Sequence, residues 1–111
     1  MTKITTHVLD TAAGHPAAGV AVTLERQSGS GWKAVVSATT DQDGRAPALA
    51  DKTDHAAGTY RLRFGTGDYF AAKKINAFYP VVEVTFTVNA GEHYHVPLLV
   101  SPFGYSTYRG S

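Results

Sequence analysis

The feature that most constrains this chain is an alternation of apolar and polar residues with a period of two. Between residues 82 and 88, apolar side chains at the even positions alternate with Glu83, Thr85 and Thr87. Successive side chains of a strand point to opposite faces, so this segment predicts a strand with one buried and one solvated face. Similar runs predict further strands over residues 4–9, 20–25, 32–40, 59–64, 94–100 and 105–108. The pattern therefore predicts an all-β chain.

Residues that favour turns separate these runs, at positions 13–16, 28–31, 41–44 and 89–91. Short strands joined by regular turns are typical of an antiparallel β-sandwich or barrel. One segment differs: residues 69–75 are predicted as a short helix, with Asp68 as its cap and Asn76 at its end. A length of 111 residues fits one domain, spanning residues 1–111.

Charge and composition limit the partners of the protein. Ten Lys and Arg against nine Asp and Glu give a net charge of +1, which predicts no nucleic-acid partner and no membrane partner. Charged residues make up 17%, below the roughly 25% of ordinary soluble domains, which suggests that another subunit covers part of the surface. The absence of cysteine excludes disulfides and thiol nucleophiles. Residues 1–7 show no export signal, so a cytoplasmic location is expected.

Two histidines lie on the outer face of a predicted strand. His93 and His95 share that face with Leu99, while the even-numbered residues of the strand face the core. Together with Pro97, they form a face that is unusually apolar for a solvated surface. A mixed apolar and imidazole face suits a subunit interface that encloses a site.

The other histidines give different signals. His7 also faces outward, opposite to the apolar residues of its strand, whereas His15 and His55 lie in polar stretches and are expected in solvated loops. His7, His93 and His95 can be interpreted as a three-histidine zinc site, because neutral imidazoles bind zinc. This signal is weak, because histidines on one strand face also occur without metal.

The remaining residues do not define a site by themselves. Arg45 follows the turn formed by Asp43 and Gly44, where an arginine is ordinarily solvated. The sequence shows no glycine-rich phosphate loop, no nucleophile elbow and no paired carboxylates, and spacing alone assigns no Ser-His-Asp triad. Patterns of residues leave the function open at this point.

At these same positions the sequence resembles the 5-hydroxyisourate hydrolases, the transthyretin-like enzymes of urate breakdown, over nearly the whole chain. The resemblance rests on residues 6–10 (THVLD), 14–17 (GHPA), 43–45 (DGR), 93–102 (HYHVPLLVSP) and 108–111 (YRGS). Hormone-carrying transthyretins are similar at residues 101–102 and 105–107, but they lack the histidines and the YRGS ending.

The resemblance implies a transthyretin-like two-sheet antiparallel β-sandwich with one short α-helix. It also implies a homotetramer, a dimer of dimers around a central channel, with active sites where the dimers meet. The implied catalytic residues are His7, Arg45 and His95. The end of the chain is implied to close the pocket and bind substrate, through Tyr108, Arg109, Gly110 and Ser111.

The implied reaction opens a cyclic amide: water adds to a ring carbonyl of the small molecule 5-hydroxyisourate and gives 2-oxo-4-hydroxy-4-carboxy-5-ureidoimidazoline, without a cofactor or metal. His7 or His95 would take a proton from water, and Arg45 would stabilise charge on the carbonyl oxygen. Which histidine is the base stays open, as does the role of His93. The alternatives are a non-catalytic transthyretin-like carrier, a zinc-dependent cyclic amide hydrolase and a monomeric adhesive sandwich module.

Overall fold

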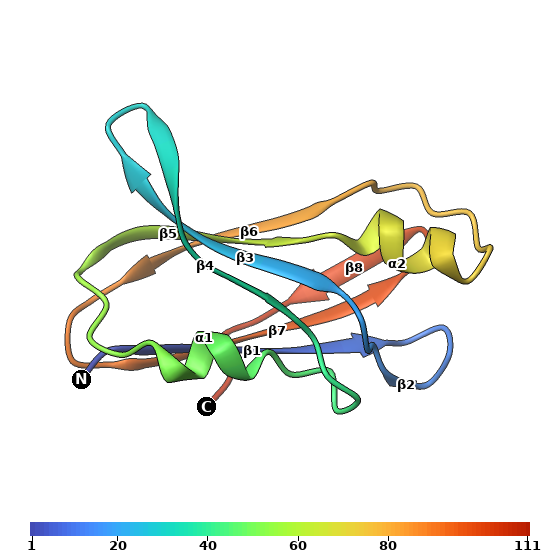
Figure 1. Cartoon of the computed structure of the whole chain (residues 1–111), viewed down its shortest axis with the longest axis horizontal. Helices are drawn as coiled ribbons and strands as arrows, with labels where there is room; N and C mark the ends of the chain where they lie inside the picture. Colours follow the sequence, from blue (N-terminus) through green and yellow to red (C-terminus); the bar gives the residue numbers. More distant parts are fainter.

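Two four-stranded sheets pack face to face in the computed structural model, which describes all residues 1–111 (Figure 1). The first sheet has the order β2 (His15–Pro16), β1 (Lys3–Asp10), β7 (His93–Ser101) and β8 (Gly104–Thr107). The second has the order β4 (Gly31–Thr39), β3 (Ala21–Ser28), β5 (Gly58–Phe64) and β6 (Val82–Val88). The prediction of an all-β, two-sheet sandwich is confirmed.

Burial alternates along the strands as the sequence pattern predicts. In β1, Ile4, Thr6 and Val8 are buried in the core, while Thr5 and His7 lie half-buried on the outer face. The same alternation places His95 on the outer face of β7. Strand parity therefore positions both histidines on the side of the sheet that faces away from the second sheet.

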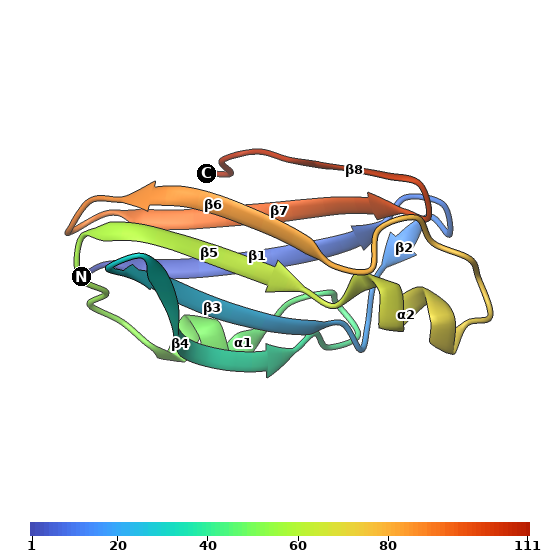
Figure 2. The ribbon, with the colours of Figure 1, turned by 90° about the horizontal axis from the view of Figure 1, so that it is seen from above.

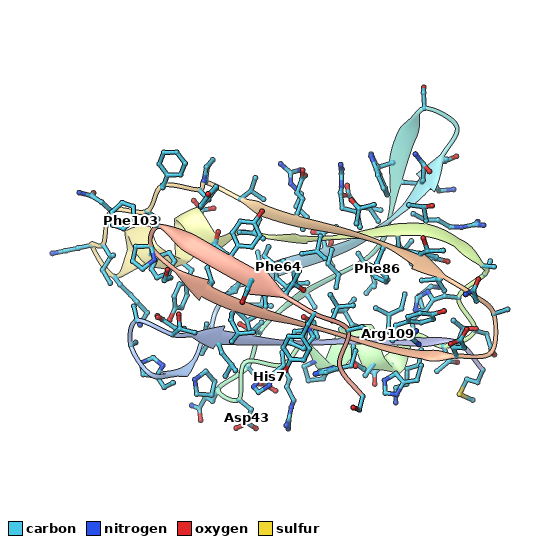
Figure 3. The ribbon with its side chains drawn as sticks, turned by 180° about the vertical axis from the view of Figure 1, so that it is seen from behind. His7, Asp43, Phe64, Phe86, Phe103 and Arg109 are labelled. Atoms are coloured by element: carbon cyan, nitrogen blue, oxygen red, sulfur yellow. The ribbon has the colours of Figure 1, made fainter.

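The space between the sheets holds one apolar core of 19 buried residues drawn from both layers. Leu62 and Phe64 of β5 are fully buried there, opposite Ile4 and Leu98 of the first sheet. Figure 3 shows Phe64 and Phe86 between the layers, whereas His7 lies on the outer side. Removal of this apolar surface from water is the main favourable contribution to folding.

Neighbouring strands pair in antiparallel fashion with one exception, because β1 and β7 run parallel. The register of this pair places Thr5 opposite His95 and His7 opposite Pro97. The outer faces of the two strands consequently lie side by side. This arrangement brings together histidines that are almost 90 positions apart in the chain.

The structure contains two short helices instead of the single one expected. Helix α2 (Thr66–Ala72) begins earlier than the predicted range of 69–75, and Asp68 lies within its first turn instead of capping it. The main chain explains the difference, because the Gly67 N–H donates to the Pro80 carbonyl and fixes this turn. Lys74 then adopts a positive φ of 59°, so the helix ends before Asn76.

Helix α1 (Pro47–Asp51) was not predicted. It contains only five residues, too few for a helical period to be visible in the sequence. Pro47 occupies its first turn, where a missing N–H costs nothing, and Leu49 is buried beneath it. The helix packs against β1 and β4. No helix of the structure is both long and apolar enough to cross a membrane.

The expectation that His55 is solvated is wrong. Its side chain is only 5% exposed, and its ring packs edge-on against Tyr60, with 5.7 Å between the ring centroids. Burial, with a smaller contribution from the charge of Lys52, lowers the pKa of His55. His15, in contrast, is exposed as expected.

A buried hydrogen bond ties α2 to the first sheet. The Tyr69 hydroxyl donates to Asp10 Oδ2 at 2.8 Å, while Oδ1 of the same carboxylate accepts from the backbone N–H groups of Ala12 and Ala13. Burial and this contact raise the pKa of Tyr69 to about 12. Asp10 therefore anchors the end of β1 to α2 and to the turn that follows the strand.

Candidate active site

A hollow of about 370 Å³ lies between the outer face of the first sheet and the loop that leads into α1. Strands, loop and helix all contribute to its lining: Thr5, Thr6, Asp41, Asp43, Arg45, Ala46, Pro47, Ala50 and His95. Figure 3 shows His7 and Asp43 on this same side of the molecule. Two of the three residues predicted as catalytic thus line one cavity.

Gly44 brings Arg45 to the sheet. The Val8 N–H donates to the Gly44 carbonyl at 2.8 Å, and Arg45 forms an isolated β-bridge with His7. Gly44 has a φ of +76°, and a Cβ at this position would lie 2.3 Å from the Val8 carbonyl oxygen. Only glycine fits such a conformation and contact, so the loop can approach β1 closely.

Asp41 fixes the loop on its other side. Its Oδ1 accepts the backbone N–H groups of Asp43 and Arg45, at 2.9 and 3.0 Å. The Asp41 N–H in turn donates to the Arg45 carbonyl at 2.8 Å. This is the turn-forming use of an aspartate side chain, and it makes Asp41 a positioning residue that the sequence analysis missed. The turn residues at 41–44 carry a signal for this role, because an aspartate at the start of a turn often accepts hydrogen bonds from the backbone N–H groups that follow it.

His95 is half-buried at the edge of the hollow, with Nδ1 2.8 Å from the Thr5 hydroxyl. Burial lowers the pKa of His95, and the charges of His7, His93 and Arg45 lower it further. Nε2 of the ring has no hydrogen-bond partner within the chain. A neutral imidazole at neutral pH, with one free nitrogen, is suited to accept a proton.

The end of the chain turns back on itself after β8 (Figure 2), and Gly110 forms an isolated β-bridge with His95. The Gly110 N–H donates to the His95 carbonyl at 2.8 Å. A Cβ on Gly110 would lie 2.6 Å from Cδ2 of the His95 ring, so the close approach requires glycine here as well. The tail therefore covers one side of the imidazole.

Tyr108 and Arg109 do not lie at His95. They line a separate pocket of about 250 Å³ beside Phe86 and Tyr94, and do not line the hollow at His95. The Arg109 guanidinium lies 4.5 Å from the centre of the Tyr94 ring and forms an ion pair with Glu92 at 3.2 Å. Strand β8 ends at Thr107, so Tyr108 lies just beyond it, although the predicted strand includes residue 108.

Two further predicted residues lie near the site. His93 is exposed, and its Nε2 is 3.2 Å from the Thr5 hydroxyl, while Ser111 is exposed at the end of the chain. The structure contains no group of three or more His, Cys, Asp or Glu side chains that is placed to hold an ion. The alternative of a zinc site at His7, His93 and His95 thus finds no support in the geometry.

The model of the HIUase/Transthyretin family, which takes its name from 5-hydroxyisourate hydrolase and transthyretin, matches residues 4–110. The chain belongs to this family. Within the HIUase/Transthyretin family, it is 49% identical over 116 residues to the 5-hydroxyisourate hydrolase of Caulobacter vibrioides, with 100% of both chains covered. The resemblance seen in the sequence is confirmed.

Solved structures of both branches of the family have the same fold. The 5-hydroxyisourate hydrolase of Klebsiella pneumoniae matches with a TM-score of 0.87 and 33% identity, over 100% of this chain and 94% of that one. Sea bream transthyretin in complex with thyroxine matches with a TM-score of 0.90 and 31% identity, over 96% and 93%. Backbone similarity alone does not separate an enzyme from a carrier.

We expect Gly44→Ala to destabilise the protein more than Gly14→Ala. Both glycines have a positive φ, +76° and +79°, but a Cβ meets nothing within 4 Å at Gly14. In the control Gly14→Ala, backbone strain alone should lower the free energy of unfolding by about 1–2 kcal/mol. In Gly44→Ala, overlap with Val8 should lower the free energy of unfolding by roughly 1–3 kcal/mol more. Denaturant unfolding at one protein concentration measures both, and equal losses would contradict the role given to Gly44.

Proposed function

We propose that this protein hydrolyses 5-hydroxyisourate to 2-oxo-4-hydroxy-4-carboxy-5-ureidoimidazoline in urate breakdown. The observation that carries the proposal is the convergence of His7, Arg45 and His95 on one outer face, through the main-chain bridge between His7 and Arg45 and the parallel register of β1 with β7. The close relatives named 5-hydroxyisourate hydrolase support it independently. The substrate is a small molecule, and the reaction is the opening of a cyclic amide by water.

A non-catalytic carrier is the main alternative, and the site argues against it. A binding channel needs shape and apolar surface, but no imidazole next to a guanidinium. Here Gly44 and Gly110 each allow a close main-chain approach that brings a group to His7 or His95 and that any other residue would block. The relatives that match at 45–51% identity over nearly the whole chain are named as 5-hydroxyisourate hydrolases, with Caulobacter vibrioides at 49%.

The mechanism starts from a neutral imidazole. His95, whose pKa is lowered, takes a proton from water at Nε2 while the water oxygen adds to the ring carbonyl, and this proton passes to the ring nitrogen as the C–N bond breaks. A general base of this kind contributes about 10²- to 10⁴-fold. Arg45 stays cationic and stabilises the negative charge that grows on the carbonyl oxygen. His7, the bridge partner of Arg45, contributes a second imidazole for binding and orienting the substrate.

We expect His95→Asn and Arg45→Ala each to lower kcat/KM at least ~100-fold, because each removes a group that acts in the transition state. The assay follows the ultraviolet decay of freshly generated 5-hydroxyisourate. His15→Asn is the matched control, since His15 is exposed and outside the hollow. Wild-type turnover by either site variant would contradict this assignment, and no turnover by the wild-type protein would refute the proposed function.

Deletion of residues 109–111 tests whether the end of the chain contributes to catalysis. It removes Gly110 from the His95 ring together with the donors of Arg109 and Ser111. We expect activity to fall at least ~30-fold, equivalent to ~2 kcal/mol, while the melting temperature changes by a few degrees. Full activity of the shortened chain would show that Arg109, Gly110 and Ser111 bind no substrate.

We further propose that the protein acts as a homotetramer, a dimer of dimers whose channel contains the sites. Phe103, Tyr105 and Tyr108 are exposed aromatic residues, and Leu9 and Leu99 are half-buried beside the histidines on the outer face. An association would remove this apolar surface from water. Sedimentation should give about four times the chain mass of 11.8 kDa, and a stable monomer at micromolar concentration would contradict the shared channel. A cytoplasmic location stays a prediction.

A further inference from the structure

The Thr5 hydroxyl contacts two imidazoles at once. Its Oγ1 lies 2.8 Å from His95 Nδ1 and 3.2 Å from His93 Nε2. The parallel register accounts for this, because Thr5 is directly opposite His95, while Lys3, two residues earlier, is opposite His93. All these side chains point to the outer face, so β1 places one hydroxyl between two rings of β7.

A threonine hydroxyl has one proton to donate and two lone pairs that accept. If Thr5 donates its proton to His93 Nε2, it accepts from an N–H at His95 Nδ1. The His95 proton then resides on Nδ1, and Nε2 keeps its lone pair. If Thr5 instead donates to His95 Nδ1, the His95 proton resides on Nε2, and that nitrogen cannot accept another. If Thr5 accepts from an N–H on both rings, His95 Nε2 again keeps its lone pair, so only donation by Thr5 to His95 Nδ1 removes the base. The first arrangement is the one that also lets Thr5 pass a proton to His93.

We propose that Thr5 is a positioning residue, which holds His95 in the tautomer with its proton on Nδ1 and connects this ring to His93 at the surface. The inference rests on the proposed function of His95 as the base. It gives His93, which lies outside the hollow, a defined part in the reaction.

The proton movements balance along this chain of hydrogen bonds. The attacking water loses a proton to His95 Nε2 as its oxygen bonds to the carbonyl carbon. The Nδ1 proton of His95 then passes to Thr5 Oγ1, while the hydroxyl proton of Thr5 passes to His93 Nε2. His95 and Thr5 each gain one bond to hydrogen and lose one, so a positive charge resides on His93 while the carbonyl oxygen is negative. When the carbonyl re-forms and the ring C–N bond breaks, the leaving nitrogen takes the proton on His95 Nε2. Thr5 then returns a proton to His95 Nδ1 and His93 returns one to Thr5, so every group regains its starting state.

The surroundings of the two rings favour a positive charge on His93 over one on His95. The charged or titratable groups around His95 come from β1, β7 and the loop before α1: Lys3, His7, His93, Asp41, Asp43 and Arg45. Burial contributes most to the lowered pKa of His95, followed by the charges of His7, His93 and Arg45. An imidazolium is thus unfavourable at His95, whereas the exposed His93 ring can be solvated by water.

Two substitutions at Thr5 separate the hydroxyl from the shape of the side chain. Thr5→Val keeps the volume and removes the hydroxyl, whereas Thr5→Ser keeps the hydroxyl. Thr23→Val is the matched control, because Thr23 is also half-buried on a strand and its hydroxyl contacts a side chain, Ser37, at 3.4 Å away from the hollow. Thr5→Val should lower kcat/KM at least ~10-fold, and both other variants should stay within about threefold of wild type.

The second measurement is nitrogen-15 NMR of protein labelled at histidine, with His93→Gln and His95→Gln for assignment. In wild type and Thr5→Ser, the neutral His95 ring should carry its proton on Nδ1, and protonation of His93 should change the His95 signals. In Thr5→Val, His95 should become a mixture of tautomers and lose its response to His93.

These readouts distinguish failure of the inference from failure of the proposed function. A proton on His95 Nε2 in the wild type, or an unchanged tautomer in Thr5→Val, would overturn the role of Thr5 whether or not the protein is a hydrolase. A changed tautomer with unchanged kcat/KM would also overturn it as a positioning residue for the reaction. Failure of the wild type to consume 5-hydroxyisourate would refute the function itself, while the NMR result would still decide how Thr5 holds His95.

Discussion

The parallel pairing of β1 with β7 determines the geometry of everything on the outer face. Its register runs without interruption from Lys3 opposite His93 to Asp10 opposite Val100. Side chains alternate along both strands, so a slip of one residue would turn every histidine inward and every core residue outward. The burial of the even-numbered residues prevents such a slip. The apolar core therefore directs the imidazoles, although none of them belongs to it.

Sequence alone predicted the strands and the outward direction of His7 and His95, because the free energy of burial imposes a period of two on any strand with one covered face. The same pattern does not show which strands become neighbours. Alternation looks alike in parallel and antiparallel pairs, so the contact between Thr5 and His95 appears only once the sheet order is known. The family resemblance supplied the proposed site residues, and the structure shows how the chain brings His7, Arg45 and His95 to one face.

The position of Arg45, the burial of His55 and the two short helices depend on main-chain conformation or on contacts with residues distant in the sequence. The local pattern of apolar and polar residues does not reveal them. Arg45 reaches the sheet because Gly44 adopts a positive φ and Asp41 holds the turn, both of which look like ordinary turn residues in sequence. His55 is buried through its contact with Tyr60, although its neighbours in sequence are polar. Short helices give too little periodicity, which explains why α1 was missed and α2 was placed late.

The β3–β4 hairpin extends away from the sandwich, as Figure 1 shows at its upper left. An irregularity in pairing between Leu24 and Glu25 accompanies this departure, and the residues at the tip, Ser28 to Gly31, are exposed. None of them lines the hollow at His95. Chain termini are the usual points for attaching a protein to a surface, but here the last residues lie against an imidazole. The hairpin tip offers a position for a fluorophore or a tether that leaves both ends of the chain free.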